Sequence, residues 1–299
     1  MSVLAALQEP TGQESAAHGQ SGEEFDLGSM IGHHILDSEE LELPFGALHL
    51  PTWEPLQIGA LTLDLSPSKH VVLMLLAAAI TLGLALTAAR VLGPHRAPRG
   101  FASVIETLVV FLRDDVCKGF IGHGYERFVP LILTFFFFIA TMNLLGLVPW
   151  GGSATGNIAV TATLAVITFL VTEIAGFIKL GPAAYMRTIF FVPPGTSGVV
   201  KYAMLAIMTP VELMGKFTKP FALAIRLFAN MTAGHMLIFS LLGLIIFFGD
   251  VSGGRWLIAG GSFVFVLAIL LLELLIAFIQ AYIFATLSAC FIGLMQHEH

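Results

Sequence analysis

Charged side chains are scarce in this sequence of 299 residues. Asp, Glu, Lys and Arg together make up 11% of it, whereas they make up about 25% of a typical soluble domain. The 14 basic residues are outnumbered by 20 acidic ones and form no basic stripe, so the sequence predicts no nucleic-acid binding. Hydrophobic residues account for 57%. This composition predicts an all-α polytopic membrane protein.

Cysteine is nearly absent as well. Cys117 and Cys290 are too few for a disulfide framework, and we interpret both as packing residues. The pair His33-His34 and the tail His297-Glu298-His299 lack the spacing of a metal site, so we expect neither metal nor cofactor. The nucleotide motif G-x-x-x-x-G-K-[ST] is also missing, which predicts no direct nucleotide binding and no catalysis by this chain alone.

Basic residues are missing from residues 1–65, which hold eleven of the twenty acids. This stretch has neither the basic start of a signal peptide nor the arginines of a mitochondrial transit peptide. It is polar and rich in Gly, Glu and Pro, and we expect it to be partly disordered, at least to Gly22. We therefore divide the chain into an acidic extracytoplasmic extension, residues 1–65, and a membrane domain, residues 66–299.

Five charge-poor segments are long enough to cross a bilayer, which takes about 20 apolar residues. The connectors after the first and third segments are basic. The connector after the second segment carries no basic residue, and the connector after the fourth carries one. Because basic connectors stay in the cytoplasm, we expect the N-terminus outside and the C-terminus inside. Without organelle-targeting signals, a bacterial inner membrane is the expected location. The expected spans are residues 70–92, 128–148, 157–179, 199–248 and 256–295.

The first cytoplasmic connector contains an amphipathic segment at residues 101–120. A helix there would place Val104, Leu108, Phe111 and Leu112 on one side. This pattern favours a helix that lies in the membrane interface, with an ordinary surface helix as the alternative.

The last two segments are too long to stand upright. Fifty helical residues extend about 75 Å and forty about 60 Å, whereas a hydrocarbon core is about 30 Å thick. These helices either break, with Pro210 and Pro220 as candidate sites, or lie strongly inclined as a paired hairpin. The remaining alternative is two ordinary spans with long interfacial tails.

One arginine, Arg226, lies inside the fourth segment. An arginine near the bilayer centre costs at least about 2.5–3.5 kcal/mol and cannot lose its proton, so it needs an anion or a water-filled cavity. The alternative is an arginine whose head reaches the interface, but the apolar flanks of Arg226 are too long for that. Ala222, Ala229, Ala233 and Asn230 share its helix face, which would let another helix approach closely.

Further polar residues occur at membrane depth on the last two segments. Asn230 and His235 follow Arg226, while Glu273 and Gln280 are seven residues apart and share a face of the final helix. Each alone is typical of an interhelical hydrogen bond, but a series of polar groups with His and Glu can also relay protons. Beside a buried arginine, we favour the relay.

Two other acids are harder to interpret. Glu173 and Glu212 either line a water-filled vestibule or form ion pairs with Lys179 or Lys216. Asn143 is more typical of a structural bond between helices.

Two motifs resemble subunit a of F-type ATP synthases. Leu223-Ala-Ile-Arg-Leu-Phe-Ala-Asn-Met-Thr-Ala-Gly-His235 is similar to that family's arginine signature, and Glu273-Leu-Leu-Ile-Ala-Phe-Ile-Gln-Ala-Tyr-Ile-Phe284 is similar to its last helix. The resemblance covers about residues 30–299. Some bacterial members carry the His/Glu pair of positions 235 and 273 with the two residue types exchanged.

The resemblance implies a stator subunit that faces a rotating ring of c subunits, with peripheral-stalk b subunits as further partners in the bilayer. Protons would enter by one half-channel, protonate a ring carboxylate, and leave by a second half-channel. Arg226 would separate the two paths and act as partner of the ring carboxylate. The entry side would include His235, Glu273, Asn230 and Gln280, and the exit side would be bordered by Glu212 and Glu173.

Two other function classes are alternatives to a stator subunit. An autonomous secondary transporter would use Arg226 to bind an anionic substrate, but no internal repeat is evident and the final segments are too long for one. A membrane enzyme with His235 and Glu273 as acid and base lacks a nucleophile or metal signature.

Overall fold

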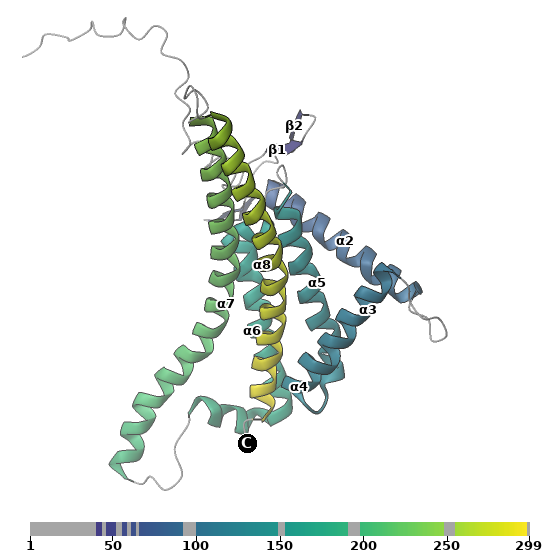
Figure 1. Ribbon diagram of the computed structural model, residues 1–299. Coiled ribbons are helices and arrows are strands. Elements are labelled where there is room, and N and C mark those ends of the chain that lie inside the picture. Colours follow the sequence, from purple (N-terminus) through teal and green to yellow (C-terminus); the bar gives the residue numbers. More distant parts are fainter. Residues whose placement is uncertain are drawn as a thin grey trace, which may run out of the picture.

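The computed structural model of the chain is a bundle of long helices (Figure 1). It describes residues 40–43, 46–51, 56–58, 61–63, 66–91, 100–148, 153–190, 198–247 and 255–297. Most of the acidic extension lies outside the described residues, including Gly22 and His33-His34, and so do Glu298 and His299. The division of the chain at residue 65 therefore stays a prediction.

Five helices among the described residues are long and apolar enough to cross a membrane, which confirms the predicted fold class. The helix α8 lies at the centre, since it packs against α5, α6 and α7; α6 and α7 also pack against each other, and α2 packs against α5. The five are α2 (Lys69–Val91), α5 (Val129–Gly146), α6 (Ile158–Ile189), α7 (Val199–Phe247) and α8 (Arg255–His297).

Two short antiparallel hairpins precede α2, and they were not predicted from the sequence. One pairs β1 (Glu40–Leu43) with β2 (Gly46–His49), and the other pairs β3 (Leu56–Ile58) with β4 (Leu61–Leu63).

The long helices α7 and α8 form the expected hairpin. They contain 49 and 43 residues, so they extend about 74 and 65 Å and must be inclined to fit a membrane. The helix α7 continues through both Pro210 and Pro220 and bends without ending (Figure 1). Each proline removes one backbone hydrogen bond, which explains a bend in an otherwise continuous helix.

The helix α6 differs from the expected third span. It extends to Ile189 rather than residue 179, because a second helical stretch follows a kink at Gly181 and Pro182. Gly181 has a φ of 76°, a left-handed conformation that favours glycine, and this turn redirects the chain. The residues after the kink therefore lie beside the end of the span.

The amphipathic segment is present, and part of its apolar side packs against the rest of the chain. It comprises α3 (Phe101–Phe111), the π-helix η1 (Leu112–Cys117) and α4 (Lys118–Ile121). Leu112 is buried and Leu108 packs against the core, whereas Val104 and Phe111 are exposed. The wider π-helical turn shifts the helix face, so that η1 and α4 pack against α8. The short 3-10 helix η2 (Tyr125–Arg127) then leads into α5.

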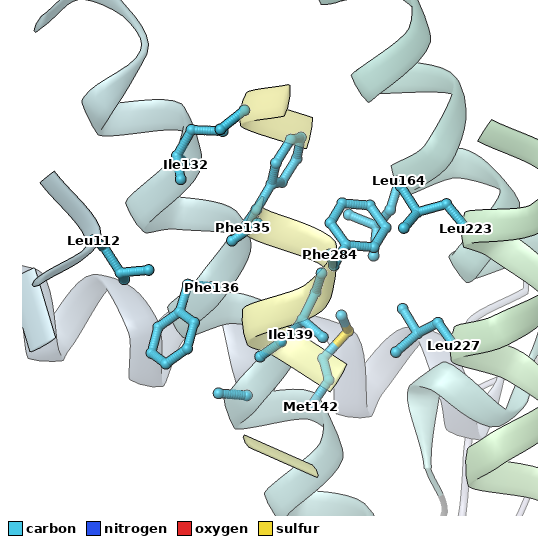
Figure 2. Close-up of a cluster of buried hydrophobic side chains, with 14 of the residues drawn as sticks. Leu112, Ile132, Phe135, Phe136, Ile139, Met142, Leu164, Leu223, Leu227 and Phe284 are labelled. Carbon is cyan, nitrogen blue, oxygen red and sulfur yellow. The ribbon is translucent and has the colours of Figure 1, made fainter. Parts of the chain in front are cut away.

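Apolar side chains from α5, α6, α7, α8 and η1 meet in one core (Figure 2). At its centre Phe135 of α5 meets Phe284 of α8 edge to face, with ring centroids 5.3 Å apart. Leu223 and Leu227 anchor one side of α7 to this core. Cys117 is also buried, and burial raises the pKa of its thiol to about 11, as befits an unreactive packing residue.

Candidate functional site

The side of α7 that carries Arg226 is uncovered. Leu223, Ala224 and Leu227 face the core and are buried. The opposite side is exposed and consists of one cation, one amide and three small residues: Ala222, Arg226, Ala229, Asn230 and Ala233. Because three of these five side chains are methyl groups, a neighbouring helix could approach the backbone of α7 closely here.

Arg226 has no acidic partner in the part of the chain that the structure describes. Among the described residues, ion pairs join Arg113 to Asp114 and Lys216 to Glu173, and none involves Arg226. Gln280 Nε2 donates a hydrogen bond to the backbone carbonyl of Arg226 at 3.4 Å. Among the described residues, no carboxylate forms an ion pair with the guanidinium.

A cavity of about 450 Å³ lies between α7 and α8, beside Arg226 along α7. Most of its wall is apolar, and its polar groups are the side chains of Asn143, Asn230, Glu273 and Gln280. The structure therefore brings together three of the four residues expected on one path. The fourth, His235, is not part of the cavity wall.

Glu273 is buried in this wall, with 8% of its surface exposed. Its Oε2 has no hydrogen-bond partner among the described groups, while its Oε1 lies directly against the α-carbon of Gly234. A buried carboxyl oxygen without a partner needs either water or a proton, and the cavity has room for water. Gly234 was missed in the sequence, although a residue without a side chain next to His235 is a signal of close approach.

His235 joins α7 to the end of α5. Its Nδ1 lies 2.9 Å from the Met231 carbonyl oxygen, and its Nε2 lies 2.9 Å from the carbonyl oxygen of Gly146. Carbonyl oxygens only accept hydrogen bonds, and a neutral imidazole has a single N–H. The ring can therefore satisfy both contacts only when it carries two protons. It is also near enough to Glu273 for their charges to interact.

Asn143 is the centre of a buried polar network. Its Nδ2 donates to the Ala277 carbonyl of α8 at 3.3 Å, and its Oδ1 accepts a hydrogen bond from Thr155 at 2.8 Å. The Thr155 hydroxyl is also 2.8 Å from that of Ser153. Thr155 lies in the 3-10 helix η3 (Ala154–Gly156), so this network ties the connector before α6 to α5 and α8. The two hydroxyl residues have no distinctive sequence pattern and were missed.

A second polar cluster lies nearer the start of α7. Glu173 of α6 is 3.1 Å from the ammonium of Lys216, and it also accepts a hydrogen bond from the hydroxyl of Tyr185. Glu173 and Glu212 line one small cavity together with Lys216 and Lys219. Glu173 thus forms one of the ion pairs considered from the sequence and also borders a small cavity, while a water-filled vestibule at this site stays a prediction. Lys179 instead donates to Gln296 of α8 at 3.1 Å.

Arg226 lies between the two clusters along α7. Glu212 precedes it by 14 residues, or about 21 Å of helix, and His235 follows it by nine residues, or about 13 Å. In the described part of the chain, no group of three or more His, Cys, Asp or Glu residues is arranged to hold a metal ion.

Comparison with known proteins gives a family. Residues 71–293 match the sequence model of a family described as ATP synthase A chain. An ATP synthase subunit a from Chloroherpeton thalassium is 48% identical over 271 residues, which cover 89% of this chain and 76% of the relative. A subunit a 2 from Chlorobaculum tepidum is 45% identical over 288 residues, covering 95% and 77%. A subunit a from Myxococcus xanthus is 42% identical over 293 residues, covering 88% and 93%.

The network around Asn143 predicts a stability effect at Thr155. Thr155→Val keeps the shape of the side chain but leaves the buried Asn143 Oδ1 without its donor, so we expect a loss of about 1–3 kcal/mol in unfolding free energy. Thermal unfolding of the purified chain in detergent measures it. Thr163→Val is the matched control, because that exposed hydroxyl bonds only to the Ala159 carbonyl of its own helix. Equal stability of the two variants would contradict a structural role for the network.

Proposed function

Because the chain belongs to the ATP synthase A chain family, we propose that it is the stator of the membrane sector of an ATP synthase. The family match and the five apolar helices make it a multi-pass membrane subunit of a proton-translocating complex. In the proposed role it forms two proton half-channels against a rotating ring of c subunits. Proton flow through them drives rotation and, on other subunits, ATP synthesis.

The uncovered, unpaired Arg226 is the observation that carries this proposal. A guanidinium at membrane depth costs at least about 2.5–3.5 kcal/mol unless an anion or water compensates it. No acid of the described chain does so, and small side chains surround Arg226 on the exposed face of α7. A ring helix that brings its own carboxylate to this face would supply the missing anion.

The larger cavity supports an entry path. Asn230, Glu273 and Gln280 offer polar groups on its wall, and the unpartnered oxygen of Glu273 can exchange protons with water there. His235 sits beside this path, with its two ring nitrogens each 2.9 Å from a backbone carbonyl oxygen. We propose that these four residues bring protons to the ring.

The smaller cavity supports an exit path. Glu212 and Glu173 border this cavity. Glu212 lies about 21 Å along α7 from Arg226. A permanent positive charge between the two cavities repels a hydronium ion that would otherwise pass directly from one to the other. Since each elementary charge that crosses gains about 2.3 kcal/mol per 100 mV, such a leak would dissipate the driving force.

The proposed orientation follows the basic connectors. With the N-terminus outside and the C-terminus in the cytoplasm of a bacterial inner membrane, the larger cavity opens toward the outside. The proposed partners are the c-ring, the peripheral-stalk b subunits and the bilayer. An autonomous transporter is not favoured, because the family match extends over residues 71–293 and so covers nearly all of the membrane domain.

Substitution of Arg226 tests the proposal. In vesicles that contain the whole complex, Arg226→Ala should abolish proton-driven ATP synthesis and raise passive proton leak, because the charge that separates the two paths is gone. Arg187→Ala, which removes an exposed arginine at the end of α6, is the control and should leave synthesis near its normal rate. Near-normal synthesis with Arg226→Ala would refute the assigned role.

The contact between Gly234 and Glu273 gives a test of the entry path. Gly234→Ala adds a methyl group where the Glu273 carboxylate lies and must displace it. Since small misplacements of a reacting group reduce rates severely, we expect synthesis to fall about tenfold or more. Gly215→Ala, also on α7 but facing open space, is the matched control. Equal rates for both variants would remove Glu273 from the path.

A further inference from the structure

Two side chains, those of Lys216 and Tyr185, meet on one oxygen of Glu173. The Lys216 ammonium lies 3.1 Å from Oε2, and the Tyr185 hydroxyl donates to the same atom. The ammonium is also 4.6 Å from the centroid of the Tyr185 ring, a cation–π distance. The side chains of Lys216 and Glu173 are only 7% and 17% exposed. Lys216 and Glu173 thus form an ion pair that is largely shielded from solvent and lies against the Tyr185 ring.

The cluster joins three separate parts of the chain. Glu173 lies on α6 before the kink, Tyr185 lies on α6 after it, and Lys216 lies on α7. The turn at Gly181 and Pro182 brings Tyr185 back to Glu173, and the Tyr185 ring also packs against Phe177 at 5.6 Å. The kink, which was not predicted from the sequence, is therefore what completes the cluster.

A second acid, Glu212, is within reach of Lys216, but the two side chains form no ion pair. Glu212 precedes Lys216 by four residues on α7, the order and spacing in which a Glu–Lys pair on a helix is most favourable. Both side chains line the same small cavity. Lys216 nevertheless pairs with Glu173 of the neighbouring helix, and Glu212 has no ion-pair partner among the described residues.

We propose that Lys216 and Glu173 form a positioning pair whose role is to keep Glu212 free to exchange protons. Glu173 draws the ammonium of Lys216 away from Glu212, and Tyr185 holds it there. Glu173 itself is occupied as a counter-ion and does not carry the proton. This inference rests on the proposed function and divides its two exit-side acids into a proton carrier, Glu212, and a positioning residue, Glu173.

Paired substitutions test this division. Glu173→Gln releases Lys216 to bind Glu212, whose charge is then compensated by a cation that opposes proton uptake. We expect ATP-driven proton pumping by the complete complex in inverted vesicles to fall about tenfold, the effect of one unit of proton affinity. Adding Lys216→Met to Glu173→Gln removes the released cation, and pumping should return to within about twofold of the original rate.

A neighbouring lysine provides the control. Lys219 lines the same cavity, but its ammonium lies 5.8 Å from the Phe291 ring and it forms no ion pair among the described residues. Lys219→Met should therefore not rescue Glu173→Gln. Rates are compared at equal amounts of assembled subunit, measured by immunoblot of the purified complex.

The outcomes separate the possible roles of the pair. Rescue by Lys216→Met and not by Lys219→Met, at equal amounts of assembled subunit, supports the positioning role, because a structural defect would lower the amount of assembled subunit instead of its rate. If the double variant pumps as poorly as Glu173→Gln, or if Glu173→Gln pumps normally, the proposed role is wrong. Arg226→Ala in the same vesicles tests the proposed function separately, since normal pumping by that variant would refute the stator role whatever the Lys216 variants do.

Discussion

A charge that cannot be lost must be compensated, and Arg226 is such a charge. Its guanidinium keeps its proton at any physiological pH and lies on a helix that belongs to the membrane. No acidic side chain of the described residues pairs with Arg226, and alanines surround this arginine on an exposed face of α7. Burial of the opposite face through Leu223 and Leu227 fixes which side of α7 is presented. The rest of the proposed mechanism depends on this arrangement.

The two polar clusters lie on either side of Arg226 along α7, and this separation is what the proposed mechanism requires. Each lies in its own cavity, and each is held by contacts between helices that are far apart in sequence. On one side α5 supplies carbonyl and amide groups to α7 and α8 through Gly146 and Asn143. On the other side α6 supplies Glu173 to Lys216 of α7. In the proposed mechanism Arg226 therefore blocks direct passage of protons between the two clusters.

Much of the fold and part of the site could be predicted from the sequence, because both depend on local periodicity. Apolar length gives the five helices, and spacings of three, four and seven residues give the exposed face around Arg226 and the shared face of Glu273 and Gln280. The π-helix and the contact of His235 with Gly146 could not be predicted, because they depend on how distant segments pack, whereas the kink has a local signal in Gly181-Pro182 that was missed. Tyr185 was missed together with the kink, since only the kink brings it to Glu173.

Cross-linking within the assembled complex tests most directly that the Arg226 face meets a ring helix. In a chain whose Cys117 and Cys290 are replaced by serine, Ala229→Cys lies on the exposed face and Leu227→Cys on the buried one. We expect a disulfide between position 229 and a cysteine placed next to the membrane carboxylate of a c subunit, and none from position 227. Failure of position 229 to cross-link, or equal cross-linking from both positions, would contradict the account.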